Sequence, residues 1–246
     1  MVNCLFMANS AESSTRHRKP KLAAPLWHTM GLLMIQLAIS LSLLRMRSRS
    51  PAAGRQHHHE NVILYLSVIA SEWALSFYVW LGGLTPGAAR VCDFVGGRWS
   101  NRKDVLRDIV IAAGFWILVT AVAVSMNFVL GPSHLESVGF LTPRGGAEIT
   151  LWVVMSVTAG FCEELVYRGH LQRQFLALTG SAALAVSVQA VLFGIAHWYQ
   201  GVRMMIVITV LGILFGILAH WRKSLRPGMI AHAWGDIVNL IAICFL

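Results

Sequence analysis

Residues 149–168 read ITLWVVMSVTAGFCEELVYR, an apolar stretch that ends in two carboxylates and an arginine. An ionisable side chain at bilayer depth costs about 2.5 kcal/mol or more, so each one requires an explanation. On a helix, Glu164 and Arg168 are four residues apart and share a face, so they can pair. Glu163 is turned by about 100° from Glu164 and lacks that partner. We therefore expect Glu164 to stay ionised beside Arg168, and Glu163 to be suited to general-base work on water. The alternative interpretation is a helix that leaves the membrane here, with Glu and Arg among the headgroups.

Apolar runs continue through the rest of the chain. Of its 246 residues 56% are hydrophobic and only 13% are charged, whereas a soluble domain carries about 25% charge. A spanning helix needs about 20 mostly apolar residues. Seven segments fit this requirement, at about 23–44, 62–84, 109–130, 149–175, 181–199, 204–221 and 229–246. The sequence therefore predicts an all-α protein, a polytopic integral membrane helix bundle with about seven transmembrane helices.

The formal net charge of +9 lies mostly in short basic segments beside the apolar runs. Such segments orient a chain in the bilayer, and we predict no nucleic-acid partner. Residues 1–22 are predicted to be a basic cytoplasmic N-terminal tail that precedes a retained anchor, not a cleaved signal. The basic loop after the first segment conflicts with this orientation. The triplet at residues 57–59 is read as part of a solvated loop, and the four cysteines as small apolar filler.

A histidine closes the fifth apolar segment, in the sequence Phe193-Gly194-Ile195-Ala196-His197. The residue midway between Glu163 and His197 is Gly180, which lies in an evident turn. In an antiparallel hairpin folded at Gly180, both side chains lie about 25 Å along their helices from the turn. The spacing therefore predicts that a carboxylate and an imidazole meet at one depth.

The last apolar segment contains His232 and Asp236, which are four residues apart on one helix face. The carboxylate can therefore fix the tautomer or the charge of the imidazole. Straight helices, however, predict a depth difference of about 14 Å between His232 and His197. Glu72, in the middle of the second segment, is a further candidate that lines a substrate cavity or pairs with a basic group.

Three motifs, EExxxR (Glu163 to Arg168), FxxxH (Phe193 to His197) and HxxxN/D (His232 to Asp236), resemble the CAAX-processing (CPBP, or Abi) family of intramembrane glutamic proteases in order and spacing. The resemblance covers residues 148–246, which would form the catalytic helical core. Residues 23–147 would supply N-terminal transmembrane helices and loops without a motif.

The resemblance implies a role for each matched residue. Glu163 would activate a water with help from His197, and His232 with the residue at 236 would form an oxyanion hole. Glu164 and Arg168 would be a structural supporting pair. Better-studied members carry Asn where this chain has Asp236, and an ionised Asp cannot donate to an oxyanion. Asp236 would therefore be protonated, orient His232 instead, or alter the activity.

The function expected from the resemblance is an intramembrane endopeptidase that uses a glutamate-activated water, without a cofactor or metal. Its partners would be the lipid bilayer and a peptide or protein substrate, with or without a lipid group. Its location would be a bacterial-type plasma membrane, crossed several times. One alternative is a zinc protease, since two histidines and a glutamate resemble a His₂Glu ligand set, although HExxH is absent. Another is a non-enzymatic bacteriocin-immunity or scaffold protein.

Overall fold

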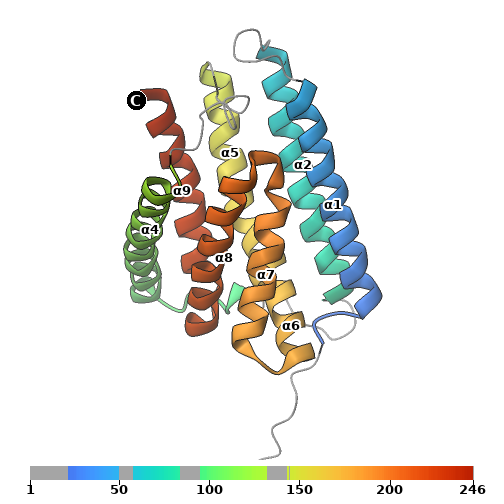
Figure 1. The fold of residues 1–246 in the computed structure, drawn as a ribbon. Helices are drawn as coiled ribbons and strands as arrows, with labels where there is room; N and C mark the ends of the chain where they lie inside the picture. Colours follow the sequence, from blue (N-terminus) through green and yellow to red (C-terminus); the bar gives the residue numbers. More distant parts are fainter. Residues whose placement is uncertain (1–21, 50–57, 84–94, 132–142, 144, 246) are drawn as a thin grey trace, which may run out of the picture.

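The computed structural model describes residues 22–49, 58–83, 95–131, 143 and 145–245. Every regular element in this part of the chain is a helix, and the helices pack side by side as a bundle (Figure 1). The predicted all-α fold class is therefore confirmed. The N-terminal tail of residues 1–21, His57, Cys4 and Cys92 lie outside the described residues. Cys162 is buried and carries a free thiol.

The bundle is assembled from long helices that run up and down. In chain order they are α1 (Leu26–Arg49), α2 (His58–Gly83), α4 (Arg102–Leu130), α5 (Gly146–Glu163), the π-helix η3 (Glu164–Leu171), α6 (Gln172–Thr179), α7 (Ala182–Ala196), the 3₁₀ turn η4 (Trp198–Gln200), α8 (Val202–Arg222) and α9 (Arg226–Phe245). The elements α5, η3 and α6 follow one another without a break, from residue 146 to residue 179.

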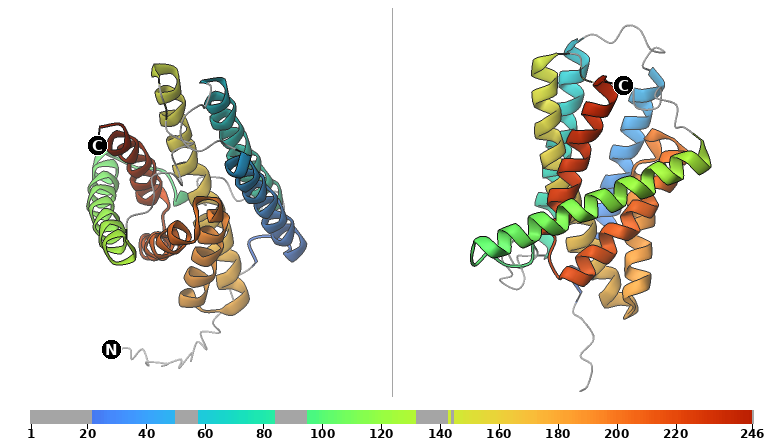
Figure 2. Two further views of the ribbon diagram at one scale, coloured as in Figure 1. Left: turned by 45° about the horizontal axis from the view of Figure 1, so that its top comes forward. Right: turned by 90° about the vertical axis from the view of Figure 1, so that its left-hand side faces the viewer.

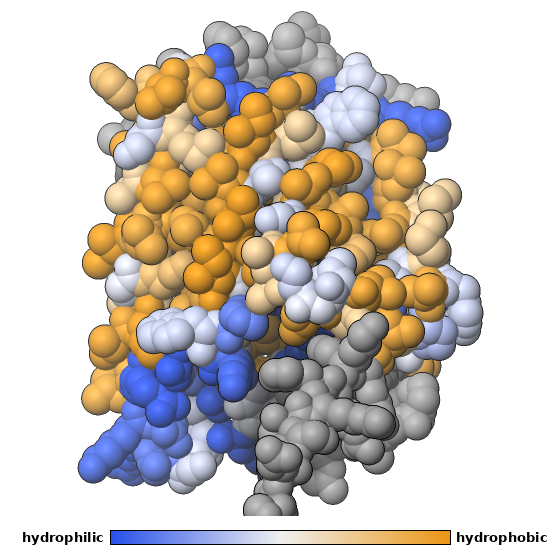
Figure 3. All heavy atoms as spheres, turned by 60° about the horizontal axis from the view of Figure 1, so that its bottom comes forward, coloured by the Kyte–Doolittle hydropathy of each residue, from blue (hydrophilic) through white to orange (hydrophobic). Residues whose placement is uncertain are grey.

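The helices have the dimensions of membrane-spanning segments. Among the described residues, five helical stretches are long and apolar enough to cross a bilayer: 26–48, 61–82, 102–130, 146–179 and 202–222. Apolar side chains cover much of the face drawn in Figure 3, and hydrophilic ones gather toward one end of it. α7 has only 15 residues, or about 22 Å, so it is shorter than a bilayer core of about 30 Å. The turn from α7 to α8 accordingly lies below the upper ends of α2 and α5 in Figure 1.

Two features of the predicted loops can be compared with the structure. Gly180 takes the left-handed conformation (φ 69°) that ends α6, and the Ser181 side chain caps α7, so the expected turn is present. The predicted end of the first segment at Leu44 is wrong, because α1 continues to Arg49. Hydropathy measures where a helix stops being apolar, and arginines can extend a helix beyond that point.

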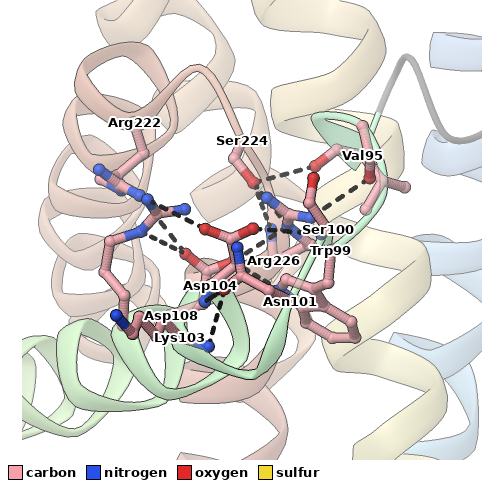
Figure 4. A network of polar contacts seen from close by, with 12 residues as sticks. Val95, Trp99, Ser100, Asn101, Lys103, Asp104, Asp108, Arg222, Ser224 and Arg226 are labelled. Carbon is pink, nitrogen blue, oxygen red and sulfur yellow. Dashed lines mark hydrogen bonds and ion pairs between the residues drawn. The ribbon is translucent and has the colours of Figure 1, made fainter.

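α4 crosses the bundle obliquely and contacts both α8 and α9 (Figure 2). Asp108 of α4 is fully buried and joins these elements at one end of the molecule (Figure 4). Its carboxylate accepts a hydrogen bond from Trp99 Nε1 at 2.9 Å and pairs with Arg226 Nε at 3.0 Å. It also lies 3.4 Å from Arg222 Nη2 and 3.7 Å from Arg107 Nε. This network fixes the corner between α8 and α9, where the helix that carries His232 begins.

α5 and α9 pack together at Gly160. A Cβ atom on this glycine would lie 2.7 Å from Ala233 N, 2.8 Å from Ala233 Cβ and 2.9 Å from Met229 O. Only a residue without a side chain permits this approach. The contact brings the first half of α9 against the last turn of α5, which is where Glu163 lies.

Candidate active site

The carboxylate pair lies where the continuous helix of residues 146–179 changes from α-helical to π-helical geometry. Glu163 is the last residue of α5, and Glu164 is the first of η3, whose eight residues are all buried. π-Helical geometry is rare and often occurs at functional sites. It changes the angular positions of Glu164, Tyr167 and Arg168 from those of a regular α-helix. The apolar sequence around these residues gave no indication of it.

Glu163 faces His197 across the helical hairpin. Glu163 Oε1 lies 3.9 Å from His197 Nε2, and the two side chains are 13% and 15% exposed. His197 Nδ1 lies 2.8 Å from the Phe193 carbonyl oxygen. Because a carbonyl can only accept, Nδ1 carries a hydrogen, and in the neutral ring Nε2 is an acceptor that points toward Glu163.

His232 lies on the other side of the same carboxylate. Its Nε2 is 3.5 Å from Glu163 Oε2, and its Nδ1 donates to Glu164 Oε1 at 3.1 Å. The predicted depth difference therefore does not keep His232 and His197 apart, because the Glu163 carboxylate lies near both rings. That prediction assumed straight, parallel α-helices, whereas α8 is inclined in Figure 1 and η3 is not α-helical.

Asp236 lies at the outer edge of this group. Its Oδ2 is 3.8 Å from His232 Nε2, and its side chain is 36% exposed, compared with 13% for His232. The backbone carbonyl of Asp236 accepts a hydrogen bond from Trp152 Nε1 at 3.1 Å. α5 therefore holds α9 by a polar contact one turn beyond His232.

Arg168 forms the base beneath the carboxylates. Its Nη1 donates to Glu164 Oε1 at 2.9 Å, and its Nη2 donates to the Gly212 carbonyl at 3.3 Å. The guanidinium lies over the rings of Phe193 (4.5 Å) and Phe215 (5.2 Å), and the residue is 2% exposed. Glu164 Oε1 thus receives hydrogen bonds from both Arg168 and His232, and this arrangement orients the imidazole.

Three further side chains lie close enough to interact electrostatically with this group. Glu72 of α2 interacts with Glu163 and His232, and so belongs with them rather than with a distant basic residue. Tyr167, four residues after Glu163, interacts with it too, and its buried hydroxyl has no hydrogen-bond partner in the part of the chain that the structure describes. Tyr199 stacks on His197 with 6.0 Å between centroids.

The sequence contained a signal for only one of the two tyrosines. The four-residue spacing of Glu163 and Tyr167 indicated a shared helix face. Tyr199 reaches the group because α7 ends early at Ala196 and η4 turns the chain back toward Glu163. As for the zinc alternative, the described residues contain no group of three or more His, Cys, Asp or Glu side chains with the arrangement of metal ligands.

Comparison with known proteins gives one match. Residues 145–238 match the family model described as Type II CAAX prenyl endopeptidase Rce1-like. No curated protein and no solved structure matches the chain. The matched range begins at the start of α5 and includes Glu163, His197, His232 and Asp236. The family resemblance carried by the three motifs is thereby confirmed.

Proposed function

We propose that this multi-pass membrane protein hydrolyses peptide bonds with a water activated by Glu163, because residues 145–238 match the family model described as Type II CAAX prenyl endopeptidase Rce1-like. One observation carries the proposal. The Glu163 carboxylate lies between two imidazoles, 3.9 Å from His197 Nε2 and 3.5 Å from His232 Nε2, within a bundle of apolar helices. Apolar side chains would stabilise the packing of these helices better than this buried polar group does, so the group points to a function.

The distances around Glu163 suit a water that is shared between acceptors. At 3.9 Å, Glu163 Oε1 and His197 Nε2 are too far apart for a direct hydrogen bond, and a water can bridge them. Both atoms would accept, so the water would donate both of its hydrogens and direct a lone pair outward. In the reaction, this water attacks the scissile carbonyl carbon, and Glu163 takes the proton.

His232 is the proposed donor to the developing oxyanion. Its Nδ1–H is held by Glu164, so its Nε2 side faces Glu163 and Asp236. As an imidazolium, it would donate from Nε2 to the tetrahedral intermediate. The carboxylates of Glu163 and Asp236 favour that protonated ring, so Asp236 acts through His232 and does not donate. When the carbon–nitrogen bond breaks, Glu163 returns its proton to the leaving amine.

The substrate class follows from the family and from the exposure of the site. We propose a peptide segment of a membrane-associated protein, lipidated or not, in a bacterial-type plasma membrane. Asp236 is the most exposed member of the group, so the substrate would approach from its side and reach Glu163 past His232.

Replacement of Glu163 by Gln tests the mechanism. The purified protein in liposomes is given one fluorogenic CAAX peptide in farnesylated and unmodified forms. We expect Glu163→Gln to lower kcat at least about 100-fold, because an amide cannot take the proton from water. Glu148→Gln is the matched control on the same helix, where the carboxylate bonds Asn61 at 3.1 Å, and it should keep most of the activity.

Three outcomes would refute parts of this proposal. Full cleavage by folded Glu163→Gln would rule out the glutamate mechanism and leave an enzyme of another kind. If a chelator abolishes the wild-type activity and added Zn²⁺ restores it, the zinc alternative is supported instead. If no peptide is cleaved and Glu163→Gln retains the biological effect of the protein, a non-enzymatic role follows.

A further inference from the structure

A cavity lined by several basic side chains lies beside Arg168. It has a volume of about 170 Å³, several times the volume of about 30 Å³ that one water occupies in the liquid. Residues of η3, α6 and the end of α8 line it: Arg168, Gln172, Arg173, Leu176, Ala219, His220, Lys223, Ser224 and Leu225. Four of these can carry a positive charge, and no carboxylate is among the lining residues that the structure describes.

Arg168 lies at the inner wall of this cavity, and one of its donors is unused. Its Nη1 and Nη2 atoms are bonded to Glu164 and Gly212, but its buried Nε has no hydrogen-bond partner in the described part of the chain. A buried guanidinium N–H without an acceptor is costly. An anion in the cavity would supply the missing acceptor.

Lys223 provides a second, independent indication. It caps the end of α8 with φ 49° and ψ 33°, and no other non-glycine residue that the structure describes has a positive φ. Glycine is the usual residue at such a helix end, because a side chain is strained there. A strained residue at a cavity indicates that its side chain is used. Lys223 forms no ion pair with any described residue.

Two neighbouring arginines differ from Lys223. Arg222 and Arg226 point toward α4 and pair with Asp108, as Figure 4 shows. Their charges are therefore balanced within the protein. The charge of Lys223 is directed to the other side of the same helix end, into the cavity.

The cavity lies at the depth of lipid headgroups. Lys223 ends α8, which is one of the five helices long enough to span, and the end of a spanning helix lies at the interface. Trp221, two residues earlier, is 67% exposed, as expected of a side chain in the interfacial belt. Phosphate is the anion that is abundant at this depth, and basic pockets between membrane helices bind anionic headgroups.

We propose that this cavity binds a phosphate group, and that its source is the headgroup of an anionic phospholipid. Arg168 and Lys223 would hold the phosphate oxygens from two sides, with Arg173 and His220 at the margin. Because Arg168 also bonds Glu164, and Glu164 bonds His232, the bound phosphate would be linked to the candidate active site through two hydrogen bonds. The binding itself does not depend on the proposed peptidase function.

Lipid binding to the purified full-length protein tests the proposal without any activity measurement. Native mass spectrometry is recorded with dioleoyl phosphatidic acid, dioleoyl phosphatidylcholine or inorganic phosphate. Lys223→Gly removes the ammonium and suits the left-handed backbone, so this variant should fold at least as well as the wild type. Lys103→Gln is the matched control, because it removes one exposed positive charge from the same end of the molecule but lies outside the cavity.

We expect phosphatidic acid to bind the wild type and Lys103→Gln with similar affinity, and Lys223→Gly at least tenfold more weakly. Arg173→Gln should show a smaller loss. Equal affinity in all four proteins would overturn the proposal, and so would equal binding of phosphatidylcholine and phosphatidic acid. If inorganic phosphate binds as tightly as the lipid and depends on Lys223 in the same way, the phosphate site stands and the lipid source is wrong.

Discussion

Asp236 is the acidic form of the HxxxN/D motif. Better-studied members carry Asn here, and in this chain the Asp236 Oδ2 atom lies 3.8 Å from His232 Nε2. An ionised carboxylate can only accept, whereas an amide can also donate to an oxyanion. Both can orient His232. The two side chains should therefore reach the same result by different routes.

We expect Asp236→Asn to keep kcat within about tenfold of the wild type. Asp236→Ala should lower kcat about 100-fold, because His232 loses the side chain that orients its ring toward the oxyanion. The cleavage rate of the farnesylated peptide, per folded protein, measures both. Wild-type activity in Asp236→Ala would remove this residue from the site altogether.

For single residues, the sequence predicted those contacts that depend only on the spacing of two residues along the chain. The turn at Gly180 places Glu163 and His197 at one depth, and the structure has them 3.9 Å apart. The four-residue spacing of Glu164 and Arg168 likewise gives an ion pair of 2.9 Å. The bond from His232 to Glu164 could not be predicted, because it depends on how α9 approaches a helix that lies far from it in the sequence.

The contact between helices α5 and α9 leaves no space for a side chain at Gly160. A Cβ at Gly160 would lie within 2.9 Å of three atoms of α9, so any side chain pushes that helix away. We expect Gly160→Val to lower stability by about 1–3 kcal/mol, as overpacking does. It should also reduce peptidase activity at least about tenfold, because His232 moves away from Glu163.

The matched control is Gly114→Val in α4, where a Cβ meets nothing within 4 Å. Both changes place valine in a long apolar helix, so a difference between them reports packing and not helix propensity. Thermal melts in detergent and peptide cleavage are the measurements. Equal melting temperatures and equal rates in the two variants would contradict the argument.

The elements themselves were predictable from apolar length, but their geometry was not. Each of the seven predicted segments overlaps a helix. Hydropathy does not register the π-helix after Glu163, because it reports how apolar a segment is and not its hydrogen-bond pattern. It does not register the inclination of α4 and α8 either. These two features decide which polar groups meet.

For the whole molecule, the distribution of basic residues predicts the orientation in the membrane. The end that carries the Asp108 network also carries Arg98, Arg102, Lys103, Arg107, Arg222, Lys223 and Arg226. The opposite end, where Arg47 donates to the Tyr199 carbonyl, has fewer among the residues that the structure describes. Basic residues concentrate on the cytoplasmic side, so the Asp108 end should be cytoplasmic.

Single cysteines test this orientation in a variant without the native ones. Lys103→Cys lies at the Asp108 end, and Gly146→Cys lies at the other end, at the start of α5. A membrane-impermeant maleimide should label Gly146→Cys in intact cells, but Lys103→Cys only after permeabilisation. The reverse pattern would show that the protein is inserted the other way round.

The pairing of Glu164 with Arg168 inside one helix has a consequence for biosynthesis. The segment from 146 to 179 leaves the ribosome before α8 and α9 have been made, so Gly212 and His232 are not yet present. The two opposite charges can neutralise each other at once, and this lowers the cost of bringing the helix into the lipid. Glu163 acquires its histidine neighbours only when His197 and then His232 arrive. A nascent chain would therefore remain inactive until its final helix had docked.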